Sequence, residues 1–467
     1  MSPQPRVLSL LSASTEIIHR LGCSHLLVGR SHGCDDPPLA TTLPIATAPR
    51  VDPNAGSREL DEAVRAQSVS GGPIYHIHSK LVSELRPDVI VTQEQCRICA
   101  VTPEDVSAAC ADWPCAKLVT IKPTTLDDVL GDMITISAAL GVPGRGQRLV
   151  SMMRARLASL AAIAREVTTT PPRVVHVEWL APLMGSGYWI AECMEAANCT
   201  MLHGSRGGHS QTLESLAALR EADVILLAPC GFSIERTHAE LASLKLLDNA
   251  EWQALPAVRR GSVAVADGNL YFNRSSCGIL HTAEIVAEIA HTELAGLFGH
   301  HGRHWVSLEE LAAFCRREGA ASPTKVVQVA PSTAGSLAKR AKVDPSLDNA
   351  AECQGASRPA QHVGKQVELL RAREFAKAFA MNSAANRSRI GSAQKFEALV
   401  ISNSSFAALT DANNALHWAE DACGGAEGRH TIKVRLQTDA SELVFAFDVS
   451  EGSAEGDCAT EGVRIIC

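Results

Sequence analysis

Two stretches of the sequence share one pattern and decide the fold class: LRPDVIVTQEQC at residues 85–96 and LREADVILLAPC at residues 219–230. In each stretch a helical segment ends, an Asp follows, and a short apolar run leads to a Cys in a loop. Short, continuous apolar strands that alternate with helical segments are typical of parallel sheets covered on both faces. The repeated pattern therefore predicts an α/β fold with two lobes, each built on a parallel sheet.

A single long helix is expected between the lobes. Each lobe opens on a similar run, PRVLSLL from residue 5 and PRVVHVEWL from residue 172. Between them, residues 144–167 (GRGQRLVSMMRARLASLAAIAREV) carry apolar side chains at helical spacing, and the prolines of TTTPP at 168–172 end the helix. The sequence thus predicts an N-terminal lobe at 5–142, a connecting helix at 143–170 and a C-terminal lobe at 171–292.

The character of the sequence changes after residue 292. Ser307 and Glu310 have the spacing of a capping box, which predicts a helix over 307–319. Residues 321–362 are rich in Ser, Pro, Ala and Gln without periodicity, so 293–362 is expected to be a short helix and a disordered linker. A small α+β tail of unknown role is predicted at 363–467, with helices at 363–381 and 404–421 and strands at 430–437 and 442–449.

Composition restricts the classes of function. The chain has 467 residues, enough for about three domains of roughly 150 residues each. Its net charge of −8 argues against a general nucleic-acid binder, because such proteins carry a basic excess. No apolar run reaches the ~18–20 residues of a membrane helix, and no secretory signal is visible at the N-terminus. We therefore predict a cytoplasmic protein with reduced cysteines, without membrane insertion and without a nucleic-acid partner.

Candidate binding residues follow from the rule that ligands bind beyond the carboxyl ends of the strands in open parallel sheets. The loops at these ends hold many of the scarce aromatic residues, which suit a large, flat or amphipathic ligand. The predicted ligand contacts are Ser12, Ser14, His32, Asp35, Tyr75, Gln93 and Cys96 in the first lobe and Glu178, Trp179, Trp189, His209, Cys230, Phe232, Asn269, Tyr271, Phe272 and Arg274 in the second.

Several of these groups allow more than one role. The imidazoles of His32 and His209 suit polar lining of a pocket, zinc or manganese coordination, or an axial bond to the metal of a bound ligand. Cys96 and Cys99 form a lone CxxC, explained either by ordinary loop thiols or by a three-thiol site with Cys230. Arg274 suits a ligand phosphate or a structural pair with Asp267.

No catalytic or resident metal site is predicted. The sequence contains no GxxxxGK[ST], GxSxG or HExxH motif. Glu178 is a lone carboxylate, and hydrolysis needs a second acid, a nucleophile or a metal at a defined distance. A further group, His300, His301 and His304, is expected on an exposed loop.

Six motifs, in order, give the chain a family resemblance: RVLSLLSASTEIIHRLG (6–22), VGRSHGCDDPP (28–38), LRPDVIVTQEQCRICAV (85–101), GGHS (207–210), LAPCGFSIERT (227–237) and LPAVRRGSVAVADGNLYFNR (255–274). Residues 5–292 resemble the substrate-binding proteins of the iron–siderophore/cobalamin class of ABC importers, particularly their cobalamin-binding branch. The resemblance implies two α/β lobes bridged by one long helix, with cobalamin or another corrinoid between the lobes.

The chain departs from that family in lacking a visible export signal and in continuing far beyond residue 292. The expected function is therefore an intracellular corrinoid-binding protein, not an enzyme, with a small-molecule ligand and a membrane transporter or corrinoid-handling protein as partner. Two alternatives remain: a protein that binds a metal or a metal chelate (siderophore, haem, zinc or manganese), and an enzyme that acts on a corrinoid or tetrapyrrole.

Overall fold

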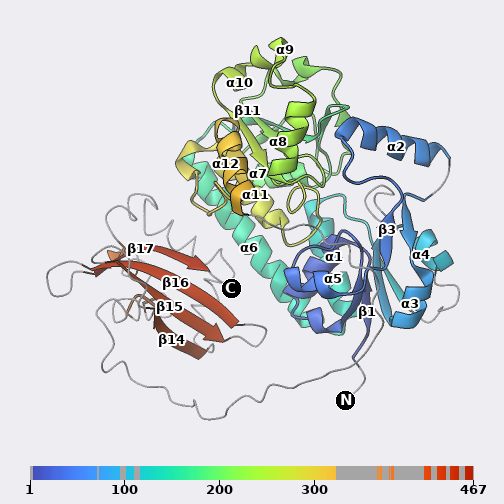
Figure 1. The fold of residues 1–467 in the computed structure, drawn as a ribbon. Coiled ribbons are helices and arrows are strands. Elements are labelled where there is room, and N and C mark those ends of the chain that lie inside the picture. Colours follow the sequence, from blue (N-terminus) through green and yellow to red (C-terminus); the bar gives the residue numbers. More distant parts are fainter. Residues whose placement is uncertain are drawn as a thin grey trace. The chain divides into compact units, whose positions relative to one another are not determined.

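The computed structural model describes residues 4–70, 73–94, 101–109, 116–321, 365–367, 369–370, 378, 380–382, 415–421, 429–437, 442–451 and 458–465. The chain divides into two compact units. The first comprises Met1–Cys315 with Ala398–Ser404, and the second comprises Arg316–Glu397 with Ser405–Cys467. Both predicted lobes belong to the first unit (Figure 1).

The N-terminal lobe is built on a four-stranded parallel sheet in the order β2-β1-β5-β6. Its central strands are runs of Val, Ile and Leu that are buried on both faces, as parallel strands between helices must be. A separate antiparallel pair is formed by β3 and β4, the strands before and after α2 in the chain. The elements are β1 (Val7–Ser9), α1 (Ser12–Arg20), η1 (Ser24–Leu26), β2 (Leu27–Arg30), η2 (Pro38–Thr42), β3 (Thr47–Pro49), α2 (Ser57–Val69), β4 (Tyr75–Ile77), α3 (Ser79–Leu85), β5 (Val89–Gln93), α4 (Pro103–Ala109), β6 (Lys117–Ile121) and α5 (Leu126–Ala139).

The C-terminal lobe has a mixed sheet in the order β10-β8-β7-β11-β12-β13, with β9 paired to β7. Strands β7, β11, β12 and β9 are parallel, whereas β8, β10 and β13 run antiparallel to their neighbours. The elements are β7 (Arg173–Trp179), β8 (Met184–Gly185), α7 (Ile190–Ala196), β9 (Thr200–Met201), β10 (Gln211–Thr212), η3 (Leu216–Leu219), β11 (Val224–Leu227), α8 (Ile234–Ser243), α9 (Ala250–Gln253), α10 (Pro256–Arg259), β12 (Val263–Ala266), α11 (Ile279–Ala290), η4 (Thr292–Leu294), β13 (Trp305–Ser307) and α12 (Leu308–Ala321).

This lobe continues past the predicted boundary at residue 292. Strand β13 pairs with β12, and Leu311 and Phe314 of α12 are buried in the core of the lobe. The capping box at the start of α12 is present, because Ser307 donates its hydroxyl to Glu310 (2.9 Å) and accepts from the Glu310 amide (3.2 Å). The turn and short strand before α12 therefore belong to the lobe and not to a linker.

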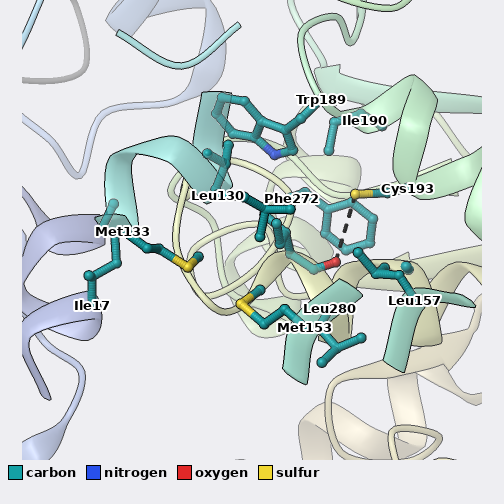
Figure 2. Close-up of a cluster of buried hydrophobic side chains, with 14 of the residues drawn as sticks. Ile17, Leu130, Met133, Met153, Leu157, Trp189, Ile190, Cys193, Phe272 and Leu280 are labelled. Atoms are coloured by element: carbon teal, nitrogen blue, oxygen red, sulfur yellow. Dashed lines mark hydrogen bonds between the residues drawn. The ribbon is translucent and has the colours of Figure 1, made fainter. Parts of the chain in front are cut away.

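One long helix, α6 (Pro143–Val167), joins the lobes. It packs on α5 of the N-terminal lobe and on α7 and α11 of the C-terminal lobe. A single apolar cluster runs through these contacts, and Figure 2 shows side chains from both lobes meeting those of α6. Its members include Ile17, Leu130, Met133, Met153, Leu157, Trp189, Cys193, Phe272 and Leu280. The two-lobed parallel-sheet fold with one connecting helix is thus confirmed, and the lobes share a continuous core.

The second unit contains a four-stranded antiparallel sheet in the order β14-β15-β16-β17. The strands are β14 (Ala415–Asp421), β15 (Arg429–Gln437), β16 (Glu442–Glu451) and β17 (Cys458–Ile465). The predictions of strands at 430–437 and 442–449 are confirmed. The predicted helix at 404–421 is wrong over 415–421, because pairing with β15 overrides the helical preference of Ala, Leu and Glu there. Residues 365–367 and 369–370 are helical, and the predicted linker beyond residue 321 falls mostly outside the described residues.

Candidate functional site

The candidate site is the seam between the lobes, which we define as the facing loops and helix ends at the carboxyl ends of both sheets. Three groups of contacts among the described residues cross it. In the first, the start of α2 meets the C-terminal lobe: Ser57 donates its amide (2.8 Å) and hydroxyl (2.5 Å) to one carboxylate oxygen of Glu240. The Trp179 indole donates to the Ser57 carbonyl (3.1 Å), and Arg236 donates to that of Ala55 (3.0 Å). These hydrogen bonds join the start of α2 in the first lobe to the C-terminal lobe.

The second group is an ion network between the α1 side of the first lobe and the loop after β12. Arg274 donates to Glu16 (2.8 Å) and to Asp35 (2.6 Å), and its side chain is 8% exposed. Asn269 donates to the other oxygen of Asp35 (2.8 Å), and the Ser276 hydroxyl donates to Glu16. The network therefore fixes two predicted contact residues, Asp35 and Asn269, by bonds between the lobes.

Arg274 is committed to this network. Burial opposes its charge, but the carboxylates of Glu16 and Asp35 outweigh burial and raise the pKa of Arg274. Its partners are therefore these two residues of the other lobe, and the structural pair that the sequence predicted with Asp267 is not the one formed. Binding a ligand phosphate through Arg274 would require this network to rearrange.

The third group lies at the start of α5. The Leu126 amide, one of the free amides of the first helical turn, donates to Glu192 of α7 (2.6 Å). Glu192 also lies 3.6 Å from the guanidinium of Arg206. Burial raises the pKa of Glu192, and the Leu126 amide and Arg206 oppose that rise. This contact ties the C-terminal lobe to the N-terminus of a helix in the first lobe.

His32 and Tyr75 form an accessible aromatic pair in the first lobe. Their ring centroids lie 5.1 Å apart, and the His32 Nδ1 lies 2.8 Å from the Thr47 hydroxyl. Burial, followed by the charge of Arg30, lowers the pKa of His32. The imidazole is therefore neutral at neutral pH, which is the form that lines a pocket as donor and acceptor or binds a metal.

Tyr188 and His209 form a second aromatic pair, in the C-terminal lobe. Their rings meet edge to face at 5.5 Å, and the Tyr188 hydroxyl lies 3.2 Å from the His209 Nδ1. The two loops approach so closely that a Cβ on Gly187 would lie 2.3 Å from the Gly208 carbonyl oxygen. Glycine at 187 is therefore what allows the His209 loop to lie against Tyr188.

The other predicted contacts that remain accessible are spread over both lobes. Ser12, Glu178, Trp179 and Tyr271 are half-buried and Cys230 is exposed. Trp179 packs edge-on against Phe232 at 5.3 Å. The loop containing Cys96 and Cys99 lies outside the described residues, so the structure does not place the predicted thiol site.

Six predicted contacts are interior residues: Ser14, Gln93, Trp189, Phe232, Phe272 and Arg274. Trp189 and Phe272 belong to the cluster around α6, and Ser14 bonds within its own turn to Ser9 and Leu11. The sequence rule points to loops, but it cannot tell which side chain of a loop turns inward. These six side chains are buried in this structure and offer a ligand little accessible surface.

Sequence reasoning missed a group behind the seam, formed by His281, Glu284, His300 and His304. The expectation of an exposed loop is wrong for His300, which is 3% exposed and lies 3.0 Å from Glu284. Burial lowers the pKa of His281, and burial beside His300 lowers that of His304 to about 3. The i, i+3 spacing of His281 and Glu284 was the available signal, but only the fold brings His300 to them.

A cavity of about 230 Å³ opens at the seam. It is lined from the first lobe by Glu16 and Asp36 among others, and from the second by Tyr271, Cys277 and His281. This volume is below the ~300–1,000 Å³ of pockets for drug-sized ligands. A macrocyclic ligand would therefore require the lobes to move apart.

Several solved structures resemble this chain. The haem-binding protein RhuT of Roseiflexus sp. RS-1 is 20% identical, with a TM-score of 0.45, over 62% of this chain and 100% of its own. A periplasmic haem-binding protein of Pseudomonas aeruginosa is 18% identical, with a TM-score of 0.47, over 62% and 94%. The vitamin B12-binding protein BtuF of Vibrio cholerae is 18% identical, with a TM-score of 0.44, over 62% and 97%. No curated protein matches the chain.

The family described as periplasmic binding protein matches residues 7–270, more than half of the chain. In the described part of the chain, no helix has both the length and the apolarity needed to cross a bilayer. The predicted cytoplasmic location is wrong: it rested on seeing neither a secretory signal nor a membrane segment, and the family is periplasmic. The chain belongs to the periplasmic binding protein family, whose members bind small-molecule solutes and deliver them to ABC transporters.

Proposed function

We propose that this protein carries a corrinoid, such as cobalamin, in the seam between its lobes and passes it to a membrane transporter. Membership of a solute-binding family supports binding without catalysis. The corrinoid is favoured by the six ordered motifs of the sequence. The proposal goes beyond membership of the family, because it names the ligand and the place where the ligand binds.

The observation that carries the proposal is the presence of accessible aromatic and polar side chains of both lobes at or next to strand ends. His32 and Tyr75 come from the first lobe, and Trp179, Tyr188 and His209 from the second. Aromatic faces contribute wide apolar contact with little loss of rotamer entropy, and imidazoles suit the amide groups that surround a corrin ring. Such a mixture fits a flat ring with a polar edge.

Ligand entry must open part of the seam. The bonds of Asp35 to Arg274 and Asn269 and the bond of Trp179 to Ser57 cross it in this structure. The apolar cluster around α6 is continuous between the lobes, so α6 is the natural hinge. We expect a small opening that breaks polar contacts at the seam and leaves the α6 cluster intact.

Equilibrium dialysis of the purified full-length chain against cyanocobalamin, together with its visible spectrum, tests the proposal. We expect one ligand per chain, and His32→Ala should weaken binding by about tenfold, the value of one lost hydrogen bond to a buried ligand. The matched control is His25→Ala, because His25 is exposed and precedes the same strand, β2, that His32 follows.

Three outcomes decide between the functions. Cobalamin binding that His32→Ala weakens and His25→Ala does not supports the seam as the site. Absence of binding with cobalamin overturns the corrinoid proposal. If the chain binds haemin tightly but does not bind cobalamin, and His32→Ala or His209→Ala abolishes haemin binding, the seam is the site of a metal chelate.

A further inference from the structure

The group behind the seam brings three metal-ligating side chains to one point. His281 and Glu284 lie on α11, and His300 lies on the loop before β13. One carboxylate oxygen of Glu284 lies 3.1 Å from the His281 Nδ1 and 3.0 Å from the His300 Nε2. All three ligand atoms lie within 4.8 Å of one another. A single ion can therefore contact all three.

Two of the three separations between the ligand atoms are close to those around a tetrahedral ion. Ligands at ~2.0–2.1 Å from zinc lie about 3.3 Å from each other, close to the two contacts of Glu284. Two imidazoles and one carboxylate are the ligand set of zinc sites that keep a fourth, open position. Only small side-chain movements separate the observed positions from coordination.

Two of the three ligands are also held by a partner outside the cluster. Arg156 of α6 donates to the second oxygen of Glu284 (2.6 Å), which leaves the first oxygen directed at the histidines. The Nδ1 of His300 lies 2.9 Å from the Nδ1 of His304, and the Tyr271 hydroxyl lies 3.2 Å from the same His304 atom. Metal-ligating histidines usually donate their other ring N–H to such a partner, which sets the tautomer.

The cavity at the seam gives an ion access to this point. His281 is one of its lining residues and its side chain is 30% exposed, whereas the side chains of Glu284 and His300 are buried. A volume of about 230 Å³ has room for several waters, one of which can fill the open coordination position. The arrangement is thus closed on the protein side and open on the solvent side.

We propose that His281, Glu284 and His300 bind one zinc ion, with a water from the cavity as the fourth ligand and His304 and Arg156 as positioning residues. The ion joins α11 to the loop at 299–304 and, through Arg156, to the connecting helix α6. It is separate from the corrinoid proposed at the seam, and neither proposal depends on the other.

The test measures zinc on the full-length chain, purified without a histidine tag, stripped with EDTA and dialysed against zinc chloride. Elemental analysis should find about one zinc per chain. His281→Gln and His300→Gln should each weaken zinc binding by at least about tenfold, and His304→Gln by about 10–100-fold, as the loss of an outer partner does. His301→Gln is the matched control, because His301 adjoins His300 but bonds to Glu310.

The measurement on the unaltered chain can overturn the proposal without any variant. Absence of zinc after dialysis, or an X-ray absorption spectrum without imidazole ligands, would show that the group is only a hydrogen-bond network. If His281→Gln and His300→Gln both retain zinc, and circular dichroism shows that both variants are folded, the ion binds elsewhere. That result would also overturn the proposal. Dialysis of the same stripped chain against cobalamin tests the proposed function separately, so either proposal can fail without the other.

Discussion

Single residues of this protein show how burial and charge compete. Asp132 of α5 has a carboxylate oxygen that is buried without a hydrogen-bond partner among the described residues. Burial, followed by the charge of Asp128, raises its pKa from 3.8 to about 7. Arg274 shows the opposite case, because two carboxylates of the other lobe compensate its burial.

Asp132→Asn should stabilise the fold, and more so at high pH. The folded protein keeps the Asp132 proton up to about pH 7, whereas the unfolded chain releases it near pH 3.8. The stability that protonated Asp132 contributes is therefore lost as the pH rises from 3.8 to about 7. We expect the free energy of unfolding to rise by about 1 kcal/mol at pH 8 and hardly at all at pH 4, since the site is partly exposed.

Urea denaturation at both pH values measures this difference. The control is Asp127→Asn, since Asp127 is 73% exposed on the same helix and pairs with Arg154 at the surface. An equal gain at pH 4 and pH 8 would contradict the assignment of the raised pKa to Asp132.

Arg274→Met should destabilise the protein strongly. The substitution leaves Glu16 buried without its cationic partner, a loss that is worth about 3–5 kcal/mol in buried pairs. Arg173→Met removes a surface pair with Asp223 and should cost far less, because exposed ion pairs contribute little to stability. Urea denaturation of both variants compares them, and equal losses would refute the importance of the seam network.

At the scale of elements, α6 holds the two lobes together by packing on both. Its buried side chains recur at helical spacing and contact helices of both lobes. Because the resulting cluster is continuous, neither lobe has a complete core without the helix (Figure 2). Separate unfolding of the lobes is therefore unfavourable.

Met153→Ala should test this role of α6. Met153 is 1% exposed within the cluster, and truncation of such a side chain costs about 2–5 kcal/mol. Ser151→Ala, two residues earlier on the exposed face, should change stability by less than about 0.5 kcal/mol. Calorimetry should show one shared transition moving to lower temperature in Met153→Ala. A split into two transitions would mean that the lobes unfold independently.

At the scale of the whole molecule, the two compact units differ in architecture. The first contains both lobes and the candidate site, and α12 completes its C-terminal lobe. The second contains the antiparallel sheet β14–β17, whose role the sequence did not reveal. The ligand-binding function is thus expected to belong to the first unit.

A chain ending at residue 321 should fold and bind cobalamin like the full-length chain. Both sheets of the lobes and the α6 cluster lie before this point. A unit with its own core can fold alone, so we expect the affinity to change by less than about twofold. Equilibrium dialysis compares the two chains, with circular dichroism confirming that the short one is folded. A tenfold loss of affinity in a folded short chain would assign part of the site to the tail.

The sequence by itself determined the two-lobed α/β class, the connecting helix and the family, because apolar periodicity and ordered motifs are local and survive in one dimension. It also located the loops of the candidate site. Only the tertiary structure decided that Arg274 pairs with Glu16 and Asp35, that Phe272 turns inward, and that His300 reaches His281 and Glu284. The physical reason is the same each time: such contacts depend on the packing of segments far apart in the chain, and no local pattern records that packing. The strand at 415–421 depends on pairing with β15 in the same way.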